Sequence, residues 1–157
     1  MKYRTNFRVK RMERGQGYGR KLLFLRNWDI GAGEHARLAV EEMVEAVKAA
    51  LQPSAERAFD FKVVVSELIN NEFMHGQGGN VRVSVAAYSS GHAELCVYGS
   101  NHGFSIEKEL ERRKGREDGW LGESGRGLVL AAALCETLRT ETDDSGRVVR
   151  ARIWMGD

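Results

Sequence analysis

The sequence has little proline and cysteine, and it lacks any long apolar run. Its 157 residues include one proline, Pro53, and two cysteines, Cys96 and Cys135. Both cysteines have apolar neighbours and no metal-ligand spacing, which indicates reduced core residues. The longest apolar run, residues 128–135, is too short to span a membrane, and the N-terminus shows no apolar signal-peptide segment. These absences exclude disulfide-rich, zinc-binding and membrane-spanning classes, so we expect a cytoplasmic protein without a membrane partner.

The bulk composition is typical of one globular domain. Hydrophobic residues make up 42% and charged residues 29%, with no repeat and no low-complexity stretch. A chain of this length suits a single core. We expect one domain in two parts, a basic N-terminal strand or hairpin segment over residues 1–29 and the main domain over residues 30–157.

The net charge of +2 conceals a strongly basic N-terminal segment. Residues 1–26 contain nine bases and one acid, a net charge of +8, and the remainder contains 15 bases and 21 acids, a net charge of −6. Such a segment could contact nucleic acid, acidic lipid or an acidic protein face. The alternation of Tyr3, Thr5, Phe7 and Val9 with polar residues favours a solvated hairpin strand instead. No nucleic-acid motif accompanies the charge, so we expect no nucleic-acid partner.

Apolar spacing predicts two helices followed by two strands. Residues 33–51 place apolar side chains on one helical face. Pro53 ends this helix, and Ser54 is the predicted N-cap of a second helix that reaches Met74. Alternating apolar residues in segments 80–88 and 92–99 then predict two strands joined as a hairpin.

The second half of the chain predicts a lid, a helix and a final hairpin. Residues 101–127 have the pattern of one long loop, with a charged stretch that is a candidate helix. A buried helix from Arg126 and a hairpin turning at residues 144–146 follow. The element order predicts an α+β fold, a two-layer sandwich with a mixed, mostly antiparallel sheet and helices on one face.

A polar stripe interrupts the second predicted helix. The segment SELINNEFMHG, residues 66–76, places Glu67, Asn71 and His75 four residues apart, on one side of a helix. An amide oxygen can bind Mg²⁺, and a carboxylate one turn away can act as a general base. A solvent-facing polar stripe explains the same pattern.

A glycine-rich segment marks the start of the later helix. GESGRGL, residues 122–128, supplies three glycines where the backbone can approach a ligand and where a helix N-terminus favours a phosphate. A plain tight turn is an equal alternative. A third segment, SNHGFSIEKEL, follows the end of a predicted strand.

In this order, the three segments resemble the GHKL ATP-binding superfamily, which includes gyrase, histidine kinases, mismatch-repair ATPases and heat-shock chaperones. The resemblance covers residues 30–155, and the small size looks most like the anti-sigma-factor serine/threonine-protein kinase branch. It implies a GHKL-type (Bergerat) α/β sandwich over residues 30–157, with ATP and Mg²⁺ as cofactors and a role in transcription regulation. The implied partner is a sigma factor or its anti-anti-sigma antagonist, and a homodimer through the first strands stays open.

The family's functional residues carry over by motif. ELINNEFMHG matches the N box, so Glu67 would be the general base, Asn71 the Mg²⁺ ligand and His75 the residue that closes the box. ESGRGL matches the second glycine box, and the cations of residues 112–116 fall in the lid. The implied nucleotide-binding residues are Asn71, Asn101, Gly103, Arg113, Lys114, Gly125, Arg126 and Gly127.

Three positions depart from the family pattern. In the best register Asn101 replaces the aspartate that accepts a hydrogen bond from adenine, and Ser105 replaces a glycine. A second register places Gly99 at the aspartate. Arg147 stands where the family has a threonine near adenine, and losing such a bond costs roughly 1–3 kcal/mol. Two interpretations remain, an Mg·ATP-dependent regulator that phosphorylates a partner and a degenerate scaffold that binds protein partners without nucleotide.

Overall fold

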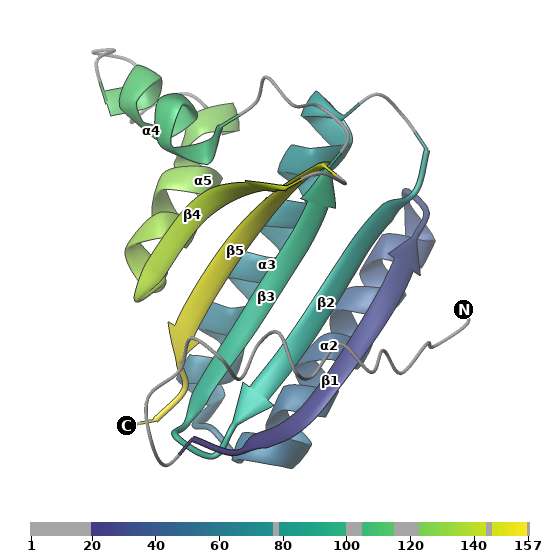
Figure 1. Cartoon of the computed structure of the whole chain (residues 1–157), viewed down its shortest axis with the longest axis vertical. Helices are drawn as coiled ribbons and strands as arrows, with labels where there is room; N and C mark the ends of the chain where they lie inside the picture. The colour runs from purple at the N-terminus through teal and green to yellow at the C-terminus, as the bar shows by residue number, and fades with distance from the viewer. Residues whose placement is uncertain (1–19, 77–78, 100–104, 115–122, 144–145, 157) are drawn as a thin grey trace.

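The computed structural model describes residues 20–76, 79–99, 105–114, 123–143 and 146–156. In this part of the chain, five strands form one sheet with the order β1-β2-β3-β5-β4 (Figure 1). The strands are β1 (Leu22–Ile30), β2 (Val81–Tyr88), β3 (His92–Gly99), β4 (Thr137–Asp143) and β5 (Gly146–Trp154). The helices are α2 (Glu34–Leu51), α3 (Ala55–His75), α4 (Ile106–Lys114) and α5 (Glu123–Leu134). The predicted α+β sandwich is confirmed, and every pairing between these strands is antiparallel.

The four described helices share one hydrophobic core with the same face of the sheet. Val83 and Leu95 represent the alternating strand positions that point into this core, and both are fully buried. Phe61 of α3, Met43 of α2 and Ile106 of α4 meet them there. In Figure 1, α2 and α3 lie behind the sheet and α5 lies beside α3. No described helix covers the opposite face of the sheet.

The break between α2 and α3 has the geometry that the sequence predicted. Gln52 adopts a left-handed conformation with φ 47°, and its N–H donates to the carbonyl of Lys48 over 2.9 Å. Pro53 follows, and Ser54 caps α3 by accepting a 3.2 Å hydrogen bond from the backbone N–H of Arg57. The two helices are therefore antiparallel neighbours joined by a tight connection.

Within the predicted loop over residues 101–127, the charged stretch does form a helix, α4, as the sequence suggested, whereas residues 123–125 belong to α5 and were wrongly predicted as loop. Ser105 caps α4, because its hydroxyl accepts from the backbone N–H of Lys108 over 3.3 Å. Ile106 is fully buried, and its N–H donates to the hydroxyl of Thr140 over 2.9 Å. The buried side chain of Ile106 and its backbone hydrogen bond to Thr140 thus hold the first turn of this highly charged helix against β4.

Both cysteines are free thiols, as the sequence predicted. Burial raises the pKa of Cys96 to about 11 and that of Cys135 to about 12. Neither thiol is therefore ionised near neutral pH, which fits inert packing residues. Among the helices that the structure describes, none has the length and apolarity needed to cross a membrane.

Candidate functional site

Helix α3 carries the residues that the sequence predicted to be catalytic and metal-binding. Val64 and Leu68 hold the helix in the core, where their exposed fractions are 0% and 2%. Glu67 and Asn71 lie beside this core-facing stripe and are half-buried, and His75 ends the helix. The predicted stripe is therefore a boundary between the core and the surface, which is the usual setting of a binding site.

The carboxylate of Glu67 lies directly against Gly127 of α5. A Cβ atom built on Gly127 would overlap the carboxyl group of Glu67, so any larger residue would push the two helices apart. The structure thus brings the two motifs together, although they are separated by about sixty residues of sequence. Because Gly127 has no side chain, the Glu67 carboxylate can lie at the backbone of α5.

The glycine-rich segment is more helical than its sequence suggests. Helix α5 begins at Glu123, so Gly125 and Gly127 lie in its first two turns rather than before them. The side chain of Arg126 lies outside the described part of the chain. The contact of this segment with the site therefore comes from Gly127.

The predicted lid and the segment SNHGFSIEKEL, residues 100–110, are described only in part. Asn101, Gly103 and Arg116 lie outside the described residues. Arg112 is on α4, 53% exposed, and its guanidinium donates to Glu109 of the same helix over 2.7 Å. Arg113 and Lys114 form the last turn of α4, and their side chains also lie outside the described part.

Sequence reasoning missed a buried ion pair beside the polar stripe. The guanidinium of Arg147 on β5 donates to the carboxylate of Glu72 on α3 over 2.5 Å, and the two side chains are 0% and 6% exposed. Gly99, the cross-strand partner of Arg147, makes room for this pair, because a Cβ at position 99 would overlap the guanidinium. The sequence held one signal of this burial. Glu72 follows the buried Val65 by two helical turns, and Arg147 lies two residues before the buried Val149, on the same face of β5.

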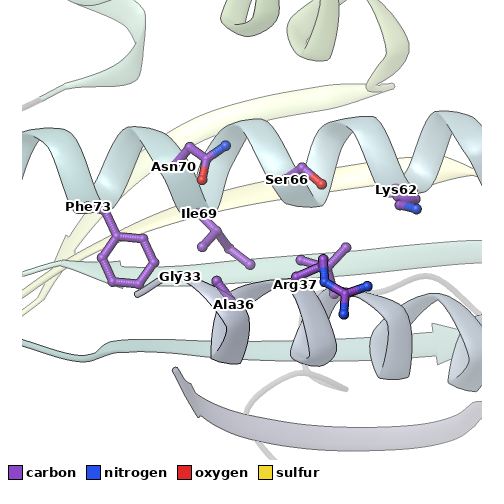
Figure 2. A pocket seen from close by; sticks show the side chains of 9 residues that line it. Gly33, Ala36, Arg37, Lys62, Ser66, Ile69, Asn70 and Phe73 are labelled. Atoms are coloured by element: carbon purple, nitrogen blue, oxygen red, sulfur yellow. The ribbon is translucent and has the colours of Figure 1, made fainter. Parts of the chain in front are cut away.

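The side of α3 that faces α2 lines a cavity of about 300 Å³ that is open to solvent (Figure 2). Asn70 lies on this side, whereas Asn71 follows Glu67 by one turn on the side toward α5. Asn70 and Asn71 therefore lie on two different sides of α3. The cavity is lined by Gly33, Ala36, Arg37, Val40, Lys62, Ser66, Ile69, Asn70 and Phe73.

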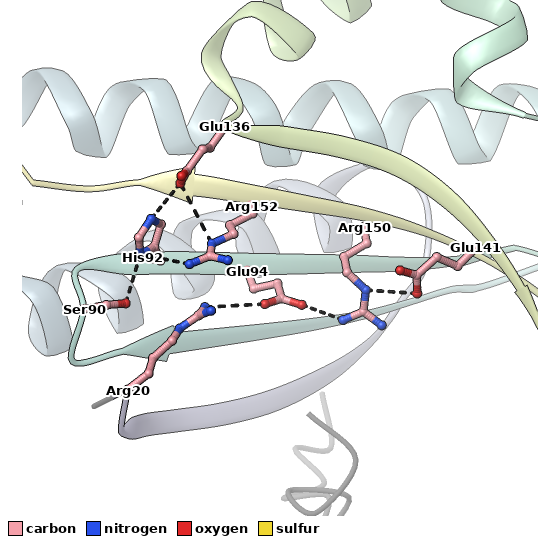
Figure 3. A network of polar contacts seen from close by, with 8 residues as sticks. All are labelled: Arg20, Ser90, His92, Glu94, Glu136, Glu141, Arg150 and Arg152. Atoms are coloured by element: carbon pink, nitrogen blue, oxygen red, sulfur yellow. Dashed lines mark hydrogen bonds and ion pairs between the residues drawn. The ribbon is translucent and has the colours of Figure 1, made fainter. Parts of the chain in front are cut away.

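The face of the sheet that no described helix covers carries a network of charged side chains (Figure 3). Glu94 at its centre accepts a 2.5 Å hydrogen bond from Arg150 and lies 3.8 Å from the guanidinium of Arg20. Arg150 also donates to Glu141 over 3.2 Å. These contacts join β3, β5, β4 and Arg20, two residues before β1, so we interpret the network as a brace across the sheet.

The comparisons with known proteins identify the family. The model of the histidine kinase-like ATPase domain family matches residues 32–153. The chain therefore belongs to the histidine kinase-like ATPase family, and the predicted GHKL membership is confirmed.

A solved structure shows the same fold. It is a chain of the SiaB–SiaC complex from Pseudomonas aeruginosa, with a TM-score of 0.52 and 17% sequence identity. The match covers 84% of this chain and 89% of that chain. At this level of identity the likeness concerns the fold alone. No curated protein matches the sequence significantly.

Proposed function

We propose that this chain is an ATP-binding regulatory protein of the anti-sigma-factor and serine-protein-kinase type. It would bind Mg·ATP beside α3, hold a sigma factor or its antagonist, and phosphorylate a serine of the antagonist in the cytoplasm. The contact between Glu67 and Gly127 carries the proposal, because it sets a carboxylate beside the glycine-rich start of α5. Membership of the histidine kinase-like ATPase family supports a nucleotide as the ligand.

The residues of α3 would divide the chemistry between them. Glu67 would accept the proton of the substrate hydroxyl, and Asn71 would give its amide oxygen to Mg²⁺. The described residues include no group of three or more His, Cys, Asp or Glu side chains placed to hold a metal ion. The other Mg²⁺ ligands would therefore be phosphate oxygens and water, which suits a cation that arrives with the nucleotide.

The other predicted residues would position and neutralise the phosphates, which is most of what phosphoryl transfer requires. Gly125, Arg126 and Gly127 would lie at the phosphates, together with Arg113 and Lys114 of the lid. Asn101 and Gly103 would lie toward the base. The similar fold occurs in a complex of SiaB with SiaC, which supports a protein partner for this chain too.

A thermal-shift titration with Mg·ATP and Mg·ADP tests nucleotide binding. We expect millimolar Mg·ATP to raise the melting temperature by several degrees, because a ligand specific to the folded state stabilises it. Asn71→Ala should abolish the shift. Asn70→Ala is the matched control, since it removes the same group from the other side of α3, and it should keep the shift. If the wild-type chain shows no shift, the proposal fails.

The buried pair of Arg147 and Glu72 favours a second candidate, a scaffold that binds protein partners without nucleotide. Arg147 stands where the family has a threonine near adenine, and its guanidinium fills the space above Gly99. In the second register Gly99 stands at the family's aspartate, and Gly99 pairs with Arg147 across the sheet. Both adenine-contacting groups would then be absent, with a fixed ion pair in their place.

A variant that restores the family's polar residues at positions 99 and 147 separates the two candidates. The triple substitution Gly99→Asp, Arg147→Thr and Glu72→Ala returns the family's two polar groups and removes both members of the buried ion pair. If the ion pair blocks the nucleotide, the wild type should show no shift with Mg·ATP and the triple variant should gain one. An equal shift in both proteins contradicts the scaffold candidate.

A further inference from the structure

We propose that the cavity between α2 and α3 is a binding site for a small organic anion with an apolar body. This site is separate from the proposed nucleotide site, because it lies on the other side of α3 from Glu67 and Gly127. Its volume of about 300 Å³ is at the small end of the range for ligand pockets, ~300–1,000 Å³. The cavity therefore fits one small molecule.

Small residues create the cavity. Gly33, the N-cap residue of α2, Ala36 of α2 and Ser66 of α3 line this space, and these residues are too small to fill it. Val40 and Ile69 form an apolar floor, with exposed fractions of 6% and 1%. A floor of this kind favours hydrocarbon or an aromatic ring over water.

Three polar side chains on α3 line the rim of the cavity at intervals of one helical turn. Lys62, Ser66 and Asn70 are spaced four residues apart and therefore share one side of the helix. Within the described residues, none of the three makes an ion pair or a side-chain hydrogen bond. Each can donate a hydrogen bond to a ligand, so the rim suits a molecule that offers acceptor atoms.

The positive charge gathers at one end of the cavity. Figure 2 shows Lys62 at the end opposite Phe73, with Arg37 and Ser66 on the same side of Ile69 as Lys62. Arg37 already contacts Glu34 and Glu41 on its own helix, and its side chain is 59% exposed. Exposed ion pairs of this kind contribute little, about 0–1 kcal/mol, so Arg37 can turn to a new anion.

The two ends define the ligand class. A carboxylate would lie between Lys62 and Arg37. Both can donate charge-assisted hydrogen bonds to it, which are stronger than hydrogen bonds between neutral groups. A ring or short alkyl chain would extend over Ile69 toward Phe73, which offers an aromatic contact. The rim amide of Asn70 would accept or donate one further hydrogen bond. This assignment also gives a role to Asn70, the asparagine that the N box does not use.

An NMR titration tests the site with two matched probes. The anion is 3-phenylpropionate, and the control is its uncharged amide, 3-phenylpropanamide. We expect 3-phenylpropionate, up to about 10 mM as is usual for fragments, to shift the amide resonances of residues 33–40 and 62–73. The amide should bind at least tenfold more weakly. Equal binding of both probes, or shifts elsewhere on the chain, would overturn the proposal.

Variants at the charged end sharpen the test. Lys62→Gln should weaken 3-phenylpropionate at least tenfold and leave the weak binding of the amide unchanged. Lys48→Gln removes an exposed lysine from the far end of α2 and should leave both titrations as in the wild type. Ser66→Leu, which fills the cavity, should abolish both. If Lys62→Gln binds the anion like the wild type, the assignment is wrong, whatever the Mg·ATP experiments show.

Discussion

The carboxylate of Glu72 on α3 and the guanidinium of Arg147 on β5 form a hydrogen-bonded ion pair that is almost completely shielded from solvent. Each charge is tolerated in the interior because the other neutralises it. The pair connects the helix that carries the candidate site to the strand that completes the sheet. It also occupies the space above Gly99, which ties the position of α3 to the end of β3.

Removing one partner of this pair should destabilise the protein strongly. We expect Arg147→Met to lower the free energy of unfolding by about 3–5 kcal/mol, because Glu72 is then left as a lone buried charge. The double variant Glu72→Leu with Arg147→Met should recover most of the loss. Urea denaturation measures both. Arg139→Met, which removes an arginine that is 62% exposed, is the control, and a single-variant loss as small as the control's would contradict the prediction.

Gly127→Ala should separate α5 from α3. The added methyl group would overlap the Glu67 carboxylate, and such overpacking costs about 1–3 kcal/mol. In the double variant Glu67→Ala with Gly127→Ala the obstacle is gone, so the stability should return toward that of Glu67→Ala alone. Chemical denaturation of the four proteins gives the coupling between the two positions. Strictly additive losses would show that the two residues do not touch.

Ser54→Ala should weaken the start of α3. The Ser54 hydroxyl accepts from the backbone N–H of Arg57, and loss of an N-cap typically costs about 1 kcal/mol. Ser54→Asp keeps an acceptor at the same place and should retain the stability of the wild type. Equal losses in the two variants would mean that the cap contributes through something other than this hydrogen bond. Urea midpoints decide the question.

His92 should make the protein less stable in mild acid. Nδ1 of His92 lies 2.9 Å from the hydroxyl of Ser90 and 3.4 Å from the guanidinium of Arg152, and Nε2 lies 2.6 Å from the carboxylate of Glu136 (Figure 3). Since arginine can only donate, a neutral imidazole that accepts at Nδ1 and donates at Nε2 fits these contacts. Burial, together with the positive charges of Arg152 and Arg20, lowers the pKa of His92 despite the opposing effect of Glu136.

The direction in which pH changes the free energy of unfolding follows from this lowered pKa. The unfolded chain binds the proton first, so the stabilising contribution is present above the ordinary histidine pKa of ~6.5 and is lost as the pH falls toward the folded value. We expect the free energy of unfolding of the wild type to fall more than that of His92→Gln between pH ~7.5 and ~5.5. His35→Gln, at an exposed position on α2, should behave like the wild type. Identical pH profiles for the wild type and His92→Gln would contradict this assignment.

The sequence predicted those parts of the fold that depend on local periodicity. Alternating apolar residues predicted β2 and β3, and the Pro53–Ser54 pair predicted the break between α2 and α3. Helix α4 was predicted only as a candidate, because its nine residues are mostly charged and show no apolar stripe. The anchor of its first turn comes from Thr140, which lies 34 residues further along the chain, so no local pattern contains it.

The same distinction applies to the candidate site. Glu67 and Asn71 follow one another by a helical turn, so their common side could be predicted from spacing alone. The contact of Glu67 with Gly127 needed the motif order of a known family. The Glu72–Arg147 pair joins residues 75 positions apart, and each looks like an ordinary charged residue until the strand and helix meet. Cross-element pairs of this kind are visible only in three dimensions.

The place of β5 in the sheet has a consequence for how the protein is made. This strand is synthesised after the other four described strands, yet it lies between β3 and β4 and pairs with β3 along residues 92–99. Until residue 154 has left the ribosome, β3 exposes a full edge of unpaired backbone groups and Glu72 lacks its arginine. Such long-range pairings form slowly, and an open edge invites association with other chains. The nascent chain therefore reaches its native sheet only after synthesis of β5, and it depends until then on protection from aggregation.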